Sequence, residues 1–211
     1  MDRSSLVVFG SGGHAKVVID AAEKQGFEHI LVVDDQEKNW GALLMGYRVL
    51  GGREALLQLG KRPPSIVAVG DNSARVSIAS WLEVQGFPLA TVIHPSTQIG
   101  RGVRIGPGSL LVAGAVVNSD AVIGANGIVN TGATVDHDCV IGEGVHLAPG
   151  VHLCGRVEIG AGSFLGVGAV VIPNVRIGVN CVVGAGSTVL VDIADNSRVA
   201  GVPARPLRKS S

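Results

Sequence analysis

The chain has 211 residues with 17 basic and 17 acidic side chains, so its formal net charge is zero. This balance argues against the basic surface on which proteins that bind nucleic acid or anionic membranes depend. The sequence has no run of 18 apolar residues, and its first apolar stretch ends in a glycine-rich loop after four residues. We therefore expect neither a signal peptide nor a membrane span, and a cytoplasmic location.

The chain begins with a pattern of strand, loop, helix and strand. Residues 6–9 are apolar, the loop over residues 10–15 reads GSGGHA, residues 16–25 have a helical period, and residues 30–33 form the next strand, which ends in Asp34 and Asp35. This loop, followed after about twenty residues by acidic side chains, is typical of sites that hold a nucleotide diphosphate at a helix N-terminus. The alternative for the two aspartates is a solvated strand end.

The rest of the first ninety residues completes a small α/β unit. We expect a short helix at 54–59, a strand at 66–69, a helix at 74–85 and a last strand at 89–93. Gly70 and Asn72 follow the third strand, at the edge of a parallel sheet where ligands bind. A full NAD domain has two such halves, so a unit of about 90 residues suits a mononucleotide better than a dinucleotide.

Residues 93–194 read as 17 consecutive groups of six without an insertion, and every group begins with Ile, Leu or Val. A period of six fits neither a helix nor a flat strand. It predicts a solenoid of short strands and turns, with one aliphatic side chain per group pointing inward and glycine supplying unusual backbone angles. Such repeats resemble the left-handed parallel β-helix of the hexapeptide acyltransferases, which implies three groups per coil and between five and six coils.

The solenoid departs from its own pattern between residues 112 and 154. Several groups there lack glycine at the second position, and three of the six histidines lie within sixteen residues: His137, His146 and His152. Places where a sequence abandons its local rule are candidates for function. Because a neutral imidazole beside a carboxylate is a good general base, His137 with Asp138 is the leading candidate for removing a proton from an attacking amine or hydroxyl.

Two other interpretations of these histidines stay open. They can be exposed turn residues, and for His152 this is the preferred interpretation. They can also hold zinc, as three histidines do at subunit interfaces of β-helix trimers of the carbonic anhydrase type. Spacings of 9 and 6 residues place the three side chains on different faces or corners of a coil of roughly 18 residues, so we expect no metal site.

The hexads stop after residue 194, and residues 195–211 form a tail. Pro203 and Pro206 end regular strand pairing there. The tail also gathers positive charge that would suit a phosphate-bearing ligand such as coenzyme A, from four residues: Arg198, Arg205, Arg208 and Lys209.

Four segments together resemble one family. They are GSGGHA, the Asp34-Asp35 pair, NTGATVDHDCVIGEGVHLAPG over residues 130–150 and VAGVPARP over residues 199–206. The combination is similar to the bacterial two-domain sugar acetyltransferases, nearest to the UDP-4-amino-sugar N-acetyltransferases of the bacillosamine pathway, with sialic-acid O-acetyltransferases as further relatives. It covers almost the whole chain.

The resemblance implies two domains followed by a tail. Residues 1–92 would be a Rossmann-like domain that binds the UDP-sugar, residues 93–194 the left-handed β-helix acetyltransferase domain, and residues 195–211 a tail that contacts CoA. The family is homotrimeric, with its active sites between neighbouring prisms.

The resemblance also implies a role for each site residue. His137 would be the general base and Asp138 its partner, although many members carry Glu at that position. Asn130 would orient the sugar amine, and His146 would meet the thioester carbonyl. The remaining expected contacts are, for the UDP-sugar, Gly12, Gly13, His14, Asp34, Asp35, Gly70 and Asn72, and, for the cofactor, Gly155, Gly201, Pro203 and Ala204.

The implied reaction is direct transfer of acetyl from acetyl-CoA to the 4-amino group of a UDP-4-amino-4,6-dideoxy-N-acetyl-hexosamine, without an acyl-enzyme and without a metal. One alternative is O-acetylation of sialic acid or another surface sugar, which needs the same base. The other is a trimeric β-helix protein that only binds a ligand or a metal. The phosphate loop favours the UDP-sugar, because a free sugar acid does not need one.

Overall fold

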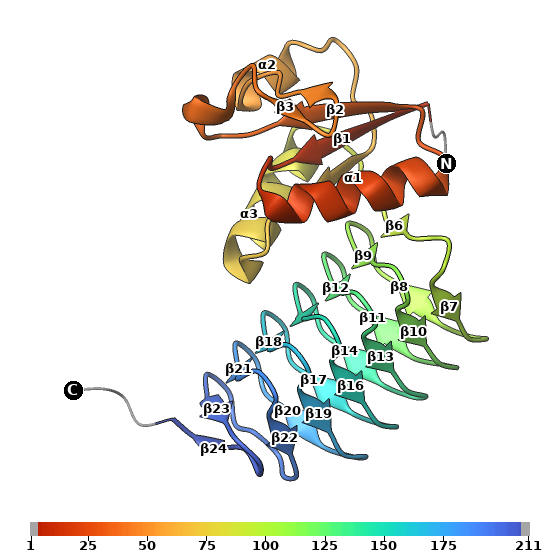
Figure 1. Cartoon of the computed structure of the whole chain (residues 1–211), viewed down its shortest axis with the longest axis vertical. Coiled ribbons are helices and arrows are strands. Elements are labelled where there is room, and N and C mark those ends of the chain that lie inside the picture. Colours follow the sequence, from red (N-terminus) through yellow and green to blue (C-terminus); the bar gives the residue numbers. More distant parts are fainter. Residues whose placement is uncertain (1–3, 208–211) are drawn as a thin grey trace. The chain divides into compact units, whose positions relative to one another are not determined.

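The computed structural model describes residues 4–207. The chain divides into two compact units, Met1–Pro95 and Ser96–Ser211. The first is a small α/β unit and the second a solenoid (Figure 1). None of the helices within the described residues is both long and apolar enough to cross a bilayer.

The first unit is built on a parallel sheet of three strands in the order β2-β1-β5. These strands are β1 (Ser5–Phe9), β2 (His29–Val33) and β5 (Ser65–Val67). The helices are α1 (Gly13–Gln25), α2 (Arg53–Leu57) and α3 (Asn72–Val84). Apolar side chains of β1, β2 and β5 pack with those of α2 and α3 in one core, as expected for strands buried by crossover helices. β6 (Val92–Ile93) ends the unit.

Helix α1 begins at Gly13, three residues earlier than the apolar period predicts, because the second half of the glycine loop already forms its first turn. The loop proper turns at Gly10, which has φ +115°. A Cβ at Gly10 would lie 2.9 Å from the backbone oxygen of Ala68. Glycine is therefore required there both by the backbone angle and by the close approach of the chain that follows β5.

A short hairpin between β2 and α2 is absent from the sequence-based expectation. It pairs β3 (Leu43–Leu44) with β4 (Tyr47–Arg48), and a single 3₁₀ turn, η1 (Glu37–Asn39), precedes it. Met45 and Gly46 make the turn with φ of 51° and 88°. A two-residue turn with positive φ at both central positions is signalled clearly by Asn-Gly but not by Met-Gly.

The second unit winds through three sheets whose strands run parallel, except for the last one, β24, and are two residues long, except for β23 with three. The first sheet holds β7 (Gln98–Ile99), β10 (Val116–Val117), β13 (Thr134–Val135), β16 (His152–Leu153), β19 (Val170–Val171) and β22 (Thr188–Val189). The second holds β8 (Arg104–Ile105), β11 (Val122–Ile123), β14 (Val140–Ile141), β17 (Glu158–Ile159) and β20 (Arg176–Ile177). The third includes β9 (Leu110–Leu111), β12 (Ile128–Val129), β15 (His146–Leu147), β18 (Phe164–Leu165), β21 (Val182–Val183), β23 (Arg198–Ala200) and β24 (Arg205–Pro206).

Successive coils stack in register 18 residues apart. Thr134 pairs with His152, for example, and His152 with Val170. The aliphatic residue that begins each hexad is the second residue of its strand, and Val135, Leu153 and Val171 are accordingly buried. The residue before it points outward. The predicted hexapeptide β-helix, with three groups per coil, is confirmed.

The reason for the glycines differs from the expected one. Those at the second hexad position stand where the next coil approaches, so that a Cβ at Gly106 would lie 2.4 Å from the Ala125 nitrogen. Positive φ occurs instead at the fourth position, in every hexad from Gly102 to Gly186. Where the fourth residue is not glycine it is Asp or Asn, the residues that best tolerate this conformation, with the single exception of Arg156.

Candidate active site

The turn from β13 to β14 carries His137, and Asp136 braces it. Asp136 Oδ1 accepts hydrogen bonds from the backbone nitrogen of His137 at 2.8 Å and from Asn118 Nδ2, one coil earlier, at 2.9 Å. The bond from His137 and then that from Asn118 lower the pKa of Asp136, against the opposing effect of burial. The departures from glycine at positions 118 and 136 are therefore connected, because together they fix the backbone at His137.

His137 Nδ1 lies 2.8 Å from Asp138 Oδ2, and both side chains are about half exposed. An ionised carboxylate can only accept a hydrogen bond, so the proton of the neutral imidazole is on Nδ1. Nε2 then carries the lone pair and is the atom able to take a proton from a nucleophile. Asp138 occupies the fourth hexad position with φ +60°, and this backbone conformation places its carboxylate beside the neighbouring ring.

Gly155 follows β16 and lies one coil after His137, at the same hexad position. A Cβ at Gly155 would lie 2.6 Å from both Cε1 and Nε2 of His137. The absence of a side chain at residue 155 thus leaves the space that the imidazole fills. The structure brings Gly155 to the predicted general base.

A second imidazole belongs to a different face of the same prism. His146 is the outward-facing first residue of β15 and is 9% exposed. Its Nε2 lies 3.1 Å from Nδ2 of Asn130, which follows β12 in the preceding coil. Its ring meets that of Phe164 edge to face, with centroids 5.2 Å apart. The structure therefore brings Asn130 and His146 into direct contact.

His152 is separate from both. It is an exposed residue of β16, and its Nδ1 lies 2.9 Å from Thr134 Oγ1. Within residues 4–207 no group of three or more His, Cys, Asp or Glu side chains is arranged to hold a metal ion.

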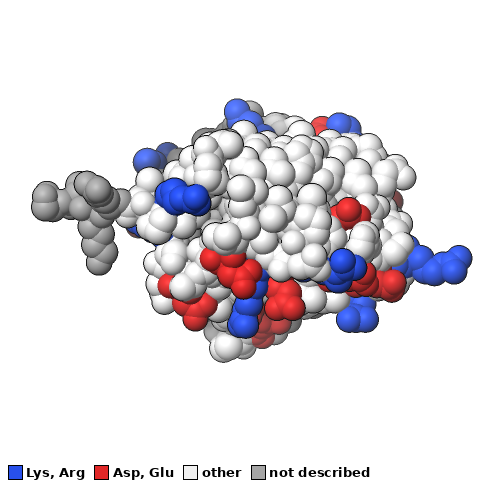
Figure 2. Space-filling view, turned by 90° about the horizontal axis from the view of Figure 1, so that it is seen from below, with Lys and Arg blue, Asp and Glu red and all other residues white. Residues whose placement is uncertain are grey.

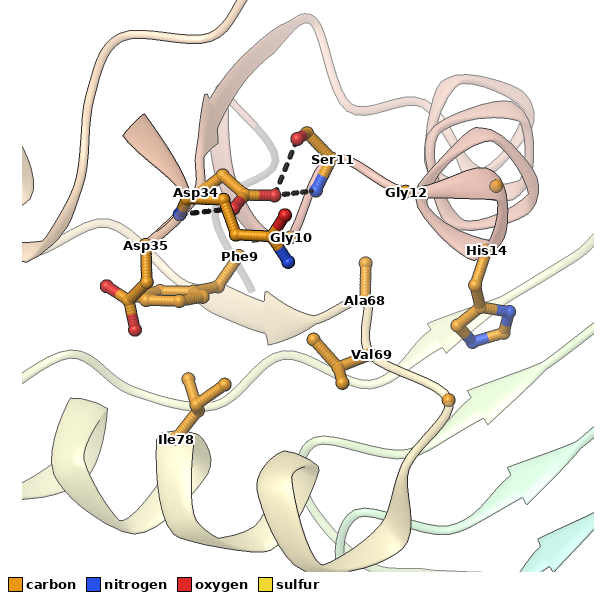
Figure 3. A pocket seen from close by; sticks show the side chains of 13 residues that line it. Phe9, Gly10, Ser11, Gly12, His14, Asp34, Asp35, Ala68, Val69 and Ile78 are labelled. Atoms are coloured by element: carbon orange, nitrogen blue, oxygen red, sulfur yellow. Dashed lines mark hydrogen bonds between the residues drawn. The ribbon is translucent and has the colours of Figure 1, made fainter. Parts of the chain in front are cut away.

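The first unit contains a cleft of about 410 Å³ at the carboxyl edge of its sheet (Figure 3). The glycine loop and the start of α1 form one side, Asp34, Asp35 and Gln36 another, and the segment after β5 a third. The first turn of α1 carries no acidic residue, and its N-cap, Gly12, contributes no side-chain cap. The N-terminal end of this 13-residue helix, with Gly12, Gly13 and His14, lines the cleft, and helix N-termini are favourable places for anionic groups.

Asp34 and Asp35 differ in role. Asp34 Oδ2 accepts from the backbone nitrogen and hydroxyl of Ser11 at 2.7 and 2.5 Å, and its Oδ1 accepts from the Gln36 nitrogen at 2.7 Å (Figure 3). Burial acts to raise the pKa of Asp34, but these hydrogen bonds, with one from Asn39, outweigh it and lower the pKa. Asp34 therefore ties the glycine loop to the end of β2, whereas Asp35 is exposed and pairs with Arg53 Nε at 3.1 Å.

His14 lines the cleft near a buried guanidinium. Burial, followed by the positive charge of Arg75, lowers the pKa of His14 to about 4, so the ring is neutral at pH 7. Arg75 is 1% exposed and donates to the backbone oxygens of Val69 and Gly70 at 3.1 and 3.2 Å and to Asn72 Oδ1 at 2.9 Å. Gly70 lines the cleft, whereas Asn72 begins α3 and contacts Arg75.

The tail returns along the last coil. β24 pairs antiparallel with β23, and Gly201 and Ala204 bond to the backbone of Thr188. A pocket of about 260 Å³ lies there, lined by Ala204 but not by Gly201 or Pro203. Figure 2, which looks at this end of the chain, shows mostly uncharged side chains, with acidic groups gathered along one edge. The predicted basic residues Arg208 and Lys209 lie outside the described residues.

Sequence reasoning missed several residues of these sites. Ser11 lies within the GSGGHA loop and Arg75 lies outside every motif, but no local pattern marks either residue as the partner of Asp34 or of the segment after β5. Phe164 lies 18 residues after His146, so the period of the coil would have placed it beside that ring.

Comparisons with known proteins match both units. The model of the PglD N-terminal domain family matches residues 5–82, and that of the bacterial transferase hexapeptide (six repeats) matches residues 138–172. A curated relative, UDP-N-acetylbacillosamine N-acetyltransferase of Bacillus subtilis, is 37% identical over 113 residues. That match spans 52% of this chain and about half, 51%, of the relative.

Solved structures match over nearly the full length. PerB from Caulobacter crescentus, in complex with CoA and GDP-perosamine, is 40% identical with a TM-score of 0.91, and the match covers 97% of both chains. The acetyltransferase domain of PglB from Neisseria gonorrhoeae, in complex with acetyl coenzyme A, is 38% identical with a TM-score of 0.90. That match covers 97% of this chain and 99% of the other.

Proposed function

Since this chain belongs to the bacterial hexapeptide-repeat sugar N-acetyltransferases with a PglD-type N-terminal domain, we propose that it transfers acetyl from acetyl-CoA to the 4-amino group of a nucleotide-linked 4-amino-4,6-dideoxy sugar. The two solved relatives that match over nearly the whole chain, one with CoA and one with acetyl coenzyme A, support the co-substrate. The observation that carries the chemistry is the 2.8 Å contact between His137 Nδ1 and Asp138 Oδ2, which leaves Nε2 as a proton acceptor.

In the proposed reaction the sugar amine attacks the thioester carbonyl and a C–N bond forms. His137 Nε2 takes the proton that the amine loses, and Asp138 stabilises the resulting imidazolium. The tetrahedral intermediate then collapses, the C–S bond breaks, and the CoA thiolate receives the proton back from His137. The products are the N-acetyl sugar and free CoA, and no acyl-enzyme forms.

The nucleotide would bind in the cleft of residues 1–92, with its diphosphate at the N-terminus of α1. Gly12, Gly13 and His14 stand at that helix end, and the buried positive charge of Arg75, which acts on His14, is compatible with a doubly anionic ligand. We propose a UDP-sugar of the bacillosamine type as the substrate. A GDP-sugar is the second candidate, because PerB, which matches over 97% of its length, was solved with GDP-perosamine.

Residues 93–194 would carry out catalysis. The tail, residues 195–211, would contact CoA through Gly201, Pro203 and Ala204. We also propose a homotrimer whose sites lie between neighbouring prisms. The half-exposed ring of His137, together with the exposed apolar side chains Val140 and Val167 on the solenoid surface, is compatible with a partner surface there.

The test is release of free thiol from acetyl-CoA with a panel of acceptors. UDP- and GDP-linked 4-amino sugars should give thiol, whereas the matching 4-hydroxy sugars and free sialic acid should not. Thiol release with sialic acid alone would favour the O-acetyltransferase alternative. Failure with every amino sugar would contradict the proposal. In His137→Ala the general base is lost, and kcat should fall by about 10²–10⁴.

A further inference from the structure

A second cavity, of about 350 Å³, adjoins the cleft of the first unit. Asp35 lines both spaces, so they border each other at this residue. Figure 3 shows Asp35 and His14 on opposite sides of the cleft. Trp40, residues 50–52 and α2 form the other walls of the second cavity. A ligand that fills both spaces would therefore run from the start of α1 past Asp35 to Trp40.

The indole of Trp40 gives the second cavity an aromatic wall. Its Nε1 donates a hydrogen bond to the backbone oxygen of Asp34 at 2.7 Å, and a Cβ at Gly52 would lie 3.2 Å from its Cζ2. These two contacts hold the ring in one orientation. Trp40 is nevertheless 45% exposed. A fixed and accessible aromatic plane is what a planar heterocycle needs for stacking.

The carboxylate of Asp35, between the two spaces, is also held in place. Arg53 Nε lies 3.3 and 3.1 Å from its two oxygens. The guanidinium of Arg53 in turn lies over the rings of Phe9 and Trp81, 5.7 and 4.6 Å from their centroids. A carboxylate only accepts hydrogen bonds, and an acidic residue that follows the second strand of such a fold is well placed to bind ribose hydroxyls.

The order of these features matches the order of groups in a nucleoside diphosphate. The start of α1 suits the diphosphate, the exposed carboxylate of Asp35 suits the ribose hydroxyls, and the indole of Trp40 suits a planar ring. Free phosphate or a sugar phosphate would occupy only the first of the two spaces.

We propose that the second cavity is a nucleobase subsite, in which the base of the substrate stacks on Trp40 while the ribose lies at Asp35. This inference rests on the proposed function, from which it takes the nucleotide-linked sugar. It adds Trp40 as a residue that determines affinity for the nucleotide. Every base has a π face, so the same indole suits the uracil of UDP and the guanine of GDP.

Binding of UDP, GDP and inorganic pyrophosphate to the full chain separates the base from the phosphates. In calorimetry, Trp40→Ala should raise the Kd of UDP or GDP by about 5- to 150-fold, the effect of losing one base-stacking contact, and leave the Kd of pyrophosphate unchanged. Trp40→Phe should restore most of the affinity, because it keeps an aromatic face. Leu43→Ala is the matched control, since Leu43 is an exposed apolar residue of β3 that lines neither space.

A second variant tests the cavity without altering Trp40. Ala55 is half-buried in α2 and lines the second cavity, so Ala55→Leu would fill part of the space that the base needs. It should weaken UDP or GDP binding and leave pyrophosphate binding unchanged. Thermal unfolding of each variant checks that the first unit remains folded.

Fluorescence gives an independent measurement of stacking. The chain has two tryptophans, so Trp81→Phe leaves Trp40 as the single indole. The emission of this variant should be quenched by UDP or GDP and not by pyrophosphate.

The nucleotide whose affinity falls in Trp40→Ala identifies the base. Three results would overturn the inference: unchanged Kd values for both nucleotides in Trp40→Ala and Ala55→Leu, an equal loss of pyrophosphate binding, or an effect seen only with an intact nucleotide-sugar, which would place the hexose in the cavity. If UDP or GDP binding depends on Trp40 but no amino sugar is acetylated, the proposed function fails and the subsite remains.

Discussion

The imidazole of His137 fills the space that a side chain at Gly155 would need, since a Cβ there would lie 2.6 Å from Cε1 and Nε2. Position 155 thus sets the placement of the ring, although it contributes no functional group.

Gly155→Ala should displace the His137 ring and lower kcat by at least tenfold, because misplacing a catalytic group by about 1 Å can cost 10²-fold. The backbone at Gly155 has no positive φ, so thermal stability should change little. Gly168→Ala is the matched control: it lies at a φ of +67° with open space around it, and should cost about 1–2 kcal/mol of stability without affecting turnover. Normal kinetics in Gly155→Ala would show that the ring tolerates the new methyl group.

Asp138→Asn should lower kcat by up to about 10⁴-fold, because an amide can donate to Nδ1 and so reverse the tautomer of His137. Asn tolerates the left-handed backbone at this position, so folding should be preserved. Asp120→Asn is the control, because Asp120 has φ +62° at the equivalent position one coil earlier and lies beside no histidine. Steady-state assays of the two variants test this prediction. If Asp138→Asn is as active as Asp120→Asn, Asp138 has no part in the mechanism.

The stability of the first unit should fall as the pH decreases from 6.5 towards 4. The pKa of His14 is about 4 in the folded protein and 6.5 when unfolded, so between these values the unfolded state binds more protons. The expected loss between pH 7.5 and pH 5 is roughly 2 kcal/mol. Urea unfolding followed by tryptophan fluorescence reports this unit, since both tryptophans, Trp40 and Trp81, belong to it. His14→Gln should remove this part of the pH dependence, and an unchanged slope would contradict the buried neutral state of His14.

Asp34 and Asp35 should respond differently to substitution. Asp34→Ala leaves the Ser11 and Gln36 donors without their carboxylate and should destabilise the first unit by about 2 kcal/mol. Asp35→Ala removes only an exposed pair with Arg53, worth about 0–1 kcal/mol. Its effect should appear as weaker nucleotide binding in calorimetry. A stability loss in Asp35→Ala as large as that in Asp34→Ala would contradict this division.

The repeat was predictable because its cause is local. Each hexad must bury one aliphatic side chain, so an aliphatic residue recurs at a fixed spacing in the sequence. The family was predictable for a related reason, since the motif segments lie in both units. The role of the second-position glycines could not be predicted in this way, because the close approach of the next coil, such as Ala125 against Gly106, involves residues just over a full coil apart.

Side-chain direction limited the rest of the prediction. From the sequence, Asp34 and Asp35 are equivalent neighbours, yet just after β2 the first is buried against the glycine loop and the second is exposed. The contact of Asn130 with His146 could have been inferred from the period of 18, because His146 pairs with Ile128. The orientation of the Asn130 side-chain amide could not be inferred, since it depends on the hydrogen bond that the backbone nitrogen of Thr131 donates to its Oδ1.

The 18-residue register also limits how the solenoid can change in length. Deleting one residue would shift every later side chain by one hexad position, exchange inside for outside and separate paired groups such as His137 and Gly155. A whole coil inserted near residue 178 would leave the spacing of those groups intact and add only height. Between residues 99 and 189 we expect the solenoid to tolerate the insertion or deletion of complete 18-residue coils. The insertion or deletion of a single residue there should prevent the solenoid from folding.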